Sequence, residues 1–314
     1  MKDQVPLKEL QSAWEYYGFS EEPFSLKPDP KFLFFTHSHW KAFSDMMAGV
    51  KERKGVIVIS GEVGIGKTIL IHALLNDLDE KIKTSFVYQT KLGFEDILKN
   101  LLIDLGGPLF KEKEGLAPLL FHFKNYLKQS ILHEKNVAVV IDEAQSLDEA
   151  VLLDLLNLVN TDISGANPLQ ILLVGHPELE EKLNSAKLRI VKKNIGVVSR
   201  IKPLNREEIW EYLKHRANVA GGNADKVFTK EAVKYIKKFS GGNPRLINIL
   251  CNQALLVGYL SSNPVIDKKI IRQSTKDLDY FTPHRPSFIL LFFLFSGMIF
   301  LFSLTFLIIN LFRR

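Results

Sequence analysis

Residues 55–68 read GVIVISGEVGIGKT, and this stretch decides the fold. Its apolar first part, residues 55–60, is typical of a buried strand. It passes directly into the pattern G-x-x-x-x-G-K-T at residues 61–68, whose glycines let the backbone curl until successive N–H groups point at phosphate oxygens. A helix starting at about Gly66 and running to Leu78 would place its positive end at the same anion. The sequence therefore predicts a nucleoside triphosphate site at the end of a buried strand.

The residues of this loop have separate expected roles. Lys67 is predicted to neutralise charge on the β- and γ-phosphates, and Thr68 to ligate Mg²⁺. The expected cofactors are therefore ATP and Mg²⁺. The residues expected to contact the nucleotide are Gly61, Glu62, Val63, Gly64, Ile65, Gly66, Lys67, Thr68 and Ile69.

Two carboxylates follow a second buried strand, residues 136–141, in a pattern that supports hydrolysis. A carboxylate at a strand tip can hold Mg²⁺ through water, and its neighbour can orient the attacking water. We assign Asp142 to the metal and Glu143 to the water. A third buried strand, residues 169–175, ends at His176, which either senses the γ-phosphate or is a loop histidine that caps the strand. The catalytic residues predicted from sequence are Glu143, Lys67, Arg245 and His176.

Strands and helices alternate as far as residue 204, which predicts a parallel sheet covered by helices on both faces, with the ligand at the carboxyl ends of the strands. The predicted helices of this α/β domain (residues 1–204) cover residues 38–51, 94–105, 116–133 and 147–160, and one further strand covers residues 84–89. Before them, residues 16–35 mix aromatic residues with prolines and predict an extended arm packed on the core.

Residues 205–280 contain helical patterns only and are predicted to form a small helical lid domain. Its helices are expected at residues 206–219, 229–240, 244–259 and 267–278. Asn243 and Pro244 mark the start of the third, which places Arg245 in its first turn, where the helix dipole disfavours a cation. An anionic ligand near Arg245 would explain this position.

The last part of the chain predicts a membrane anchor. Residues 287–312 contain no charged side chain, and about 24 helical residues span roughly 36 Å, enough for a hydrocarbon core of about 30 Å. We expect a short linker at residues 281–286 and one transmembrane helix at residues 287–311. The basic residues before the span place the preceding domains in the cytoplasm, so the expected location is the inner (cytoplasmic) membrane, crossed once.

Composition sets few further limits. The formal charge of +6 and the pI of about 9.1 permit nucleic acid or anionic lipid as partners without deciding between them. The single cysteine, Cys251, excludes an internal disulfide and is expected to be an apolar packing residue of a helix.

Together these features resemble the ExeA (general secretion pathway protein A) family of AAA+ ATPases, over nearly all of residues 14–280. The motifs that carry the resemblance are Tyr17-Gly-Phe, Pro23-Phe-Ser, Pro28-Asp-Pro-Lys-Phe-Leu, His39, the loop at 61–68, Ile141-Asp-Glu-Ala-Gln, Gly175-His-Pro-Glu-Leu, Pro203-Leu-Asn-Arg-Glu-Glu and Ser240-Gly-Gly-Asn-Pro-Arg-Leu-Ile-Asn. The resemblance implies an AAA+ fold, Arg245 as the sensor 2 arginine, the aromatic arm as part of the adenine pocket, and a homo-oligomer.

The chain departs from this family at three places. His176 stands where relatives usually carry glutamine. Asn194 stands near the position of a candidate arginine finger, for which Arg189, Lys192, Lys193 or Arg200 are possible substitutes. The family continues beyond the membrane helix into a peptidoglycan-binding part, whereas this sequence ends at Arg314, so direct wall binding is not expected.

Three functions follow as hypotheses. The first is a membrane-anchored AAA+ ATPase that drives assembly or operation of a bacterial envelope complex for secretion, pilus formation or exopolysaccharide export, with proteins of that machine as partners. The second is a DNA-associated regulator, because transposition ATPases of the TniB and TnsC kind resemble the same module; nucleic acid is nevertheless not the expected partner. The third is a nucleotide-dependent switch with slow turnover.

Overall fold

Five parallel strands form one sheet in the order β2-β3-β4-β1-β5. The computed structural model describes residues 7–27, 29–88, 92–108, 110, 115–159 and 167–278. The strands are β1 Val56–Ser60, β2 Ile82–Val87, β3 Asn136–Ile141, β4 Leu169–Gly175 and β5 Ile195–Arg200. Because β1 lies between β4 and β5, the chain must cross two strands to reach β2, and ligands of such sheets bind beside the strand where the order reverses.

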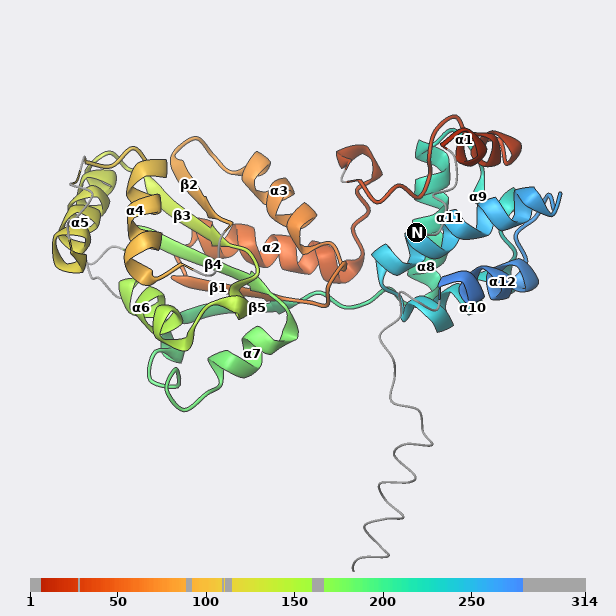
Figure 1. Ribbon diagram of the computed structural model, residues 1–314. Helices are drawn as coiled ribbons and strands as arrows, with labels where there is room; N and C mark the ends of the chain where they lie inside the picture. The colour runs from red at the N-terminus through yellow and green to blue at the C-terminus, as the bar shows by residue number, and fades with distance from the viewer. Residues whose placement is uncertain are drawn as a thin grey trace, which may run out of the picture.

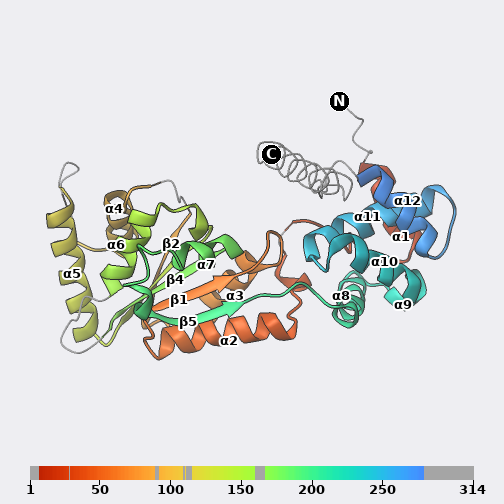
Figure 2. The same cartoon turned by 90° about the horizontal axis from the view of Figure 1, so that it is seen from below.

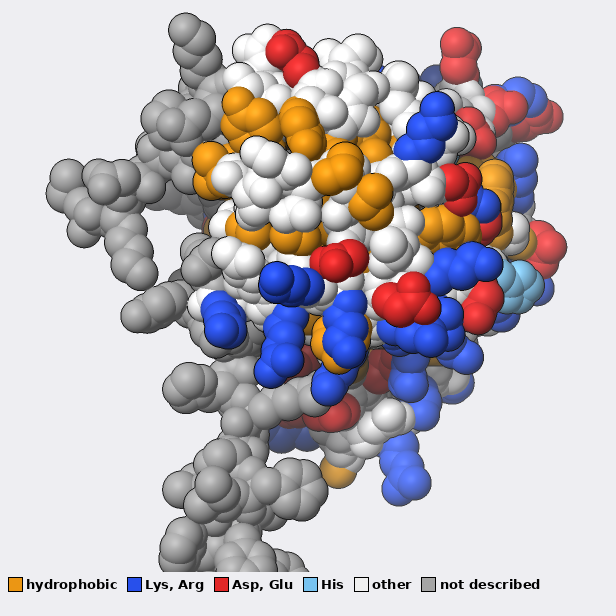
Figure 3. All heavy atoms as spheres, turned by 90° about the vertical axis from the view of Figure 1, so that its right-hand side faces the viewer, with side chains coloured by type: hydrophobic (Ala, Val, Ile, Leu, Met, Phe, Trp, Pro, Cys, Tyr) orange, Lys and Arg blue, Asp and Glu red, His pale blue; other side chains and the backbone are white. Residues whose placement is uncertain are grey.

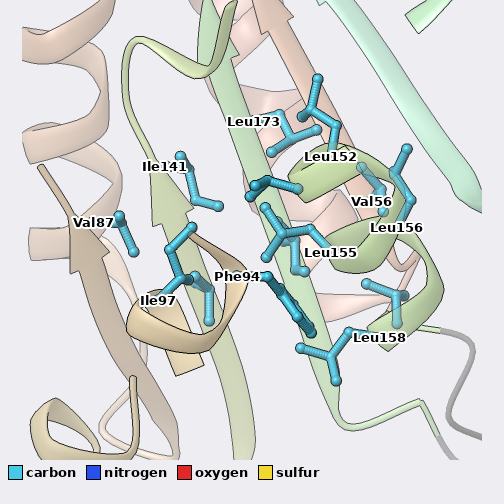
Figure 4. Close-up of a cluster of buried hydrophobic side chains, with 14 of the residues drawn as sticks. Val56, Val87, Phe94, Ile97, Ile141, Leu152, Leu155, Leu156, Leu158 and Leu173 are labelled. Atoms are coloured by element: carbon cyan, nitrogen blue, oxygen red, sulfur yellow. The ribbon is translucent and has the colours of Figure 1, made fainter. Parts of the chain in front are cut away.

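Helices cover both faces of this sheet (Figure 1). The helices of this lobe are α2 His37–Lys51, α3 Lys67–Asp77, α4 Phe94–Asp104, α5 Leu116–Leu132, α6 Glu149–Val159 and α7 Pro177–Leu183. Successive strand residues point to opposite faces. Val56 and Val58 therefore pack with α4 and α6, as Figure 4 shows for Val56, whereas Ile57 and Ile59 pack with α2 and α3.

The predicted three-layer parallel sheet is confirmed, with differences at its edges. Strand β2 runs from Ile82 to Val87, earlier than the predicted residues 84–89, because it pairs with β3 from Ile82↔Asn136 onward. As an edge strand it carries exposed Lys83 and Thr84, so its start has no apolar signal. The sequence analysis gave no bounds for β5, and it did not predict α7.

The second lobe is helical, as predicted for the lid, and lies beyond the end of β5 (Figure 2). Its helices are α8 Arg206–Val219, α9 Ala224–Val227, α10 Lys230–Ser240, α11 Pro244–Leu260 and α12 Lys268–Leu278. Helices α10, α11 and α12 pack on one another. Cys251 lies buried in α11, as expected for a packing residue.

The N-terminal aromatic arm packs on this helical lobe, whereas the sequence analysis grouped it with the α/β domain. An unpredicted helix, α1 Leu7–Tyr16, leads into the arm and contacts α11. Phe19, Phe24 and Phe32 are then buried in the lid core. Arg216 of α8 fixes the arm by donating from Nε to the Pro23 carbonyl (2.6 Å) and from Nη2 to the Ser25 carbonyl (3.0 Å).

The predicted linker at residues 281–286 and the predicted transmembrane helix at residues 287–311 lie outside the described residues. Among the helices that the structure describes, none has the length and apolar content needed to cross a membrane.

Candidate nucleotide-binding site

The loop at residues 61–68 curls between the end of β1 and the start of α3. Gly66 takes a left-handed conformation (φ 110°) as the N-cap of α3, and Gly64 another (φ 76°). A Cβ on Gly64 would lie 2.7 Å from the Cβ of Arg245, and one on Gly66 would lie 3.2 Å from Nε2 of His39. Backbone conformation therefore favours glycine at both positions, and lack of space excludes a larger residue at Gly64.

Lys67 is held inside this curl. Its Nζ donates to the carbonyl oxygens of Gly61 (2.8 Å) and Glu62 (3.0 Å), and the residue is 5% exposed. Burial lowers the pKa of Lys67, while the carboxylates of Glu143 and Asp142 act in the opposite direction. A desolvated ammonium beside curled backbone amides is suited to a phosphate oxygen, which would supply the missing counter-charge.

Thr68, in the first turn of α3, contacts Asp142, which directly follows β3. The Thr68 hydroxyl donates to Oδ2 of Asp142 (2.9 Å). The described residues contain no group of three or more His, Cys, Asp or Glu side chains that could hold a metal by themselves. One hydroxyl and one carboxylate suit Mg²⁺, which takes its remaining ligands from phosphate and water.

Glu143 lies beside His176 and is held by Gln145, which belongs to the motif at residues 141–145 but had no predicted role. Its backbone is left-handed (φ 54°), and its Oε2 lies 3.4 Å from Nε2 of His176. Gln145 donates from Nε2 to Oε2 of Glu143 (2.6 Å) and accepts at Oε1 from the His176 backbone N–H (3.0 Å). Gln145 therefore links the predicted water-orienting carboxylate to the predicted sensor.

His39 is a second residue whose role was not predicted, although it is among the residues that carry the family resemblance. It is buried in α2, with Nε2 2.9 Å from the Ile65 carbonyl and Nδ1 2.7 Å from the Thr36 hydroxyl. Because a carbonyl only accepts, Nε2 carries the hydrogen, and the neutral ring accepts from Thr36 at Nδ1. His39 thus ties α2 to the phosphate loop.

The lid contributes the other wall of the site. Asn243 caps α11 by accepting from the Arg245 backbone N–H (3.0 Å), and its Nδ2 donates to the Val63 carbonyl in the loop (2.6 Å). Arg245 follows in the first turn, directly over Gly64. A cavity of about 360 Å³ lies between the lobes, within the usual size of ligand sites, and its lining includes Lys67, Thr68, Glu143, His176 and Arg245.

The arm closes one side of this cavity. Phe32, Phe34 and Tyr212 line it together with the loop residues. Arg216 stacks over Phe32, with its guanidinium carbon 4.3 Å from the ring centroid. This apolar wall next to a phosphate loop fits a flat base, so the lining as a whole is suited to a nucleotide.

The candidate finger residues lie away from this cavity. Arg200, at the end of β5, pairs with Glu180, from Nη2 to Oε2 at 2.5 Å and from Nε to Oε1 at 3.0 Å. Lys192 donates to the Asn184 side chain (2.6 Å), and Asn194 to the Leu156 carbonyl (2.9 Å). Arg189 and Lys193 are exposed.

Comparisons with known proteins find relatives for most of the chain. The model of a family described as an AAA domain matches residues 50–183. General secretion pathway protein A of Aeromonas hydrophila is 31% identical over 245 residues, covering 78% of this chain and 44% of the relative. An uncharacterized HTH-type transcriptional regulator of Methanocaldococcus jannaschii is 24% identical over 57% of this chain and 43% of its own length. The chain thus spans less than half of the curated relatives it matches.

Among solved structures, the ORC2 protein of Aeropyrum pernix, in ADPNP–ADP complexes, aligns with a TM-score of 0.58 and 19% identity. The alignment covers 82% of this chain and 71% of that protein. At this identity the likeness establishes the fold alone.

Proposed function

The chain is an ExeA-like AAA+ protein, and from this premise we propose that it is a membrane-anchored ATPase that couples ATP hydrolysis to the work of a bacterial envelope complex. The observation that carries the hydrolysis proposal is the convergence of Lys67, Glu143, His176 and Arg245 on one cavity between the two lobes. Relation to general secretion pathway protein A supports a secretion, pilus or polysaccharide-export machine as the partner.

In this proposal the protein acts by positioning and electrostatics. Lys67 and Arg245 stabilise negative charge on the transferred phosphoryl group from opposite sides, one from the loop and one from the lid. Thr68 and Asp142 would hold Mg²⁺, which would supply positive charge to the phosphates. Glu143 orients the attacking water, and Gln145 and His176 hold Glu143 in place.

The membrane anchor rests on the sequence of residues 287–311, and the homo-oligomer on the usual completion of AAA+ sites by a neighbouring subunit. A slow nucleotide-dependent switch remains the second candidate, favoured by one observation. Arg200 and Lys192, two possible substitutes for the arginine finger, are bonded within their own subunit.

The test of the envelope role uses the full chain in its native membranes. A Glu143→Gln variant should load ATP and stay loaded, whereas Lys67→Ala should not load. Mass spectrometry then identifies the proteins that copurify with Glu143→Gln and not with Lys67→Ala, and these are the partners. Enrichment of secretin, pilus or polysaccharide-export components supports the proposal, and enrichment of transposase or DNA contradicts it.

A further inference from the structure

The positive charge of this protein is concentrated in one lobe. Residues 205–278 contain 13 lysines and arginines against 7 acidic residues, a net charge of +6, which equals the formal charge of the whole chain. The remaining residues therefore balance, with 28 basic and 28 acidic side chains. A charge surplus confined to one lobe acts locally, so it matters where on that lobe it lies.

Most of these basic side chains lie on two neighbouring helices, α10 and α12, at the end of the molecule remote from the sheet. On α10, Lys230, Lys234 and Lys238 follow one another at four-residue spacing, and on α12 so do Lys268, Arg272 and Lys276. Four-residue spacing places side chains on one helix face. Figure 3 shows blue side chains gathered across the lower half of this end. With the exposed Lys226 and Lys269, these residues form what we call the basic face.

Carboxylates of the described residues do not neutralise these cations. Within the described parts of the chain, none of the eight forms an ion pair, whereas Lys41, Lys54 and Lys81 on the α/β lobe each pair with a carboxylate. Lys268 instead lies over the Tyr235 ring, 5.1 Å from its centroid, which joins the two helices. Nearby Asp267 is engaged in capping α12. Unpaired like charges held together repel one another, and an external anionic surface would relieve this repulsion.

We propose that the basic face docks on the anionic lipid headgroups of the membrane that holds the predicted anchor. The inference rests on the proposed anchor in one respect, the distance between α12 and the membrane. Helix α12 ends at Leu278 and the apolar sequence starts at Ser287. The eight residues between them reach at most about 28 Å when fully extended, so a membrane-inserted chain keeps α12 near the headgroups.

Lipid fits this face better than nucleic acid does. Seven of the eight cations are lysines, compact point charges on flexible stems, whereas reading of base edges favours arginine and stacking needs exposed aromatic side chains. Polybasic segments beside a membrane span bind anionic headgroups through this kind of charge. Because α12 packs on α11, whose first turn carries Arg245, docking would also fix the lobe that holds the predicted sensor.

The test places the full chain in nanodiscs of phosphatidylcholine alone or with 30% phosphatidylglycerol, a composition we choose for the probe. Lysine acetylation rates are then measured by mass spectrometry. We expect Lys230, Lys234, Lys238 and Lys276 to react at least about three-fold more slowly on the anionic discs and to regain their rate at high salt. Lys124 and Lys128, exposed on α5 at the same spacing, should react equally on both discs.

Matched variants test whether the lipid-dependent protection comes from the basic face or from any group of exposed lysines. Changing Lys230, Lys234, Lys238, Arg272 and Lys276 to Gln should abolish the lipid-dependent protection of the three remaining lysines of the face, Lys226, Lys268 and Lys269. Changing Lys124 and Lys128 to Gln should leave that protection intact. Equal acetylation rates on both discs, with the chain still bound to them, would overturn the docking proposal while agreeing with the proposed membrane anchor.

Co-elution with the discs tests the anchor separately. Co-elution with anionic discs only supports the basic face and contradicts the anchor, and co-elution with neither contradicts both. Duplex DNA that protects the same lysines on phosphatidylcholine discs, where anionic lipid does not, would assign the face to nucleic acid and overturn the proposal.

Discussion

His39 shows how a single buried side chain can set the shape of a phosphate loop. Its ring bridges the Thr36 hydroxyl and the Ile65 carbonyl, and it fills the space that a Cβ on Gly66 would need. Burial lowers the pKa of His39, partly opposed by the bond to Ile65 and by Glu208. The ring therefore acts as a neutral support in the folded protein.

This burial makes stability depend on pH. The pKa of His39 in the folded protein lies below its ordinary value of 6.5. As pH falls below 6.5, the unfolded chain therefore binds more protons at His39 than the folded protein does. The stability present above pH 6.5 is lost as pH falls toward the folded pKa. We expect His39→Gln to lose less stability than the parent between pH 7.5 and 5.5. Urea unfolding without nucleotide measures the free energy of unfolding of both proteins at the two pH values. His215, whose pKa burial also lowers, remains in both proteins as the background. An identical loss in both proteins would contradict the assignment.

Gln145 is a positioning residue in this account, since it touches Glu143 and the His176 backbone. We expect Gln145→Ala to lower kcat for ATP hydrolysis by about ten-fold or more, because a water-orienting group must be held in geometry, while nucleotide affinity stays unchanged. Steady-state kinetics and nucleotide titration measure the two quantities. Gln129→Ala, on the exposed side of α5, is the control. A loss of affinity with kcat intact would show that Gln145 serves binding instead.

At the scale of elements, the N-terminus of α11 joins the lid to the loop. Asn243 and Thr229 are both N-caps whose side chains accept backbone N–H bonds, but only Asn243 also reaches the loop, at the Val63 carbonyl. We expect Asn243→Ala and Thr229→Ala each to cost about 1 kcal/mol of stability. Only Asn243→Ala should weaken nucleotide binding. Equal affinities in the two variants would show that this contact does not couple the lid to the site.

Elements that lie inside the sheet could be predicted from the sequence, and elements at its margins could not. Strands β3 and β4 are buried throughout, so their apolar runs gave the observed bounds. Edge strand β2 mixes Lys83 and Thr84 into its sequence, which hides its start. Residues brought together only by the fold, such as Gln145 with Glu143 and Asn243 with Val63, leave no spacing signal by which their contacts could be found.

For the whole molecule, the site exists only where the two lobes meet. The α/β lobe supplies Lys67, Thr68 and Glu143, and the lid supplies Arg245 and, with the arm, the apolar wall. A change in the angle between the lobes therefore changes the distance between Arg245 and the loop. The lid also carries the basic face, so one helical unit with a shared core connects the candidate nucleotide site to the proposed membrane surface.

The central claim is that this cavity hydrolyses ATP with Glu143 orienting the water. The most direct measurement is ATP turnover with Mg²⁺ by the full chain in lipid discs, beside the affinity for ATP, in the parent, Glu143→Gln and the surface control Glu134→Gln. We predict that Glu143→Gln binds ATP as tightly as the parent and turns it over at least about 100-fold more slowly, with Glu134→Gln unchanged. Undiminished turnover by Glu143→Gln would contradict the account.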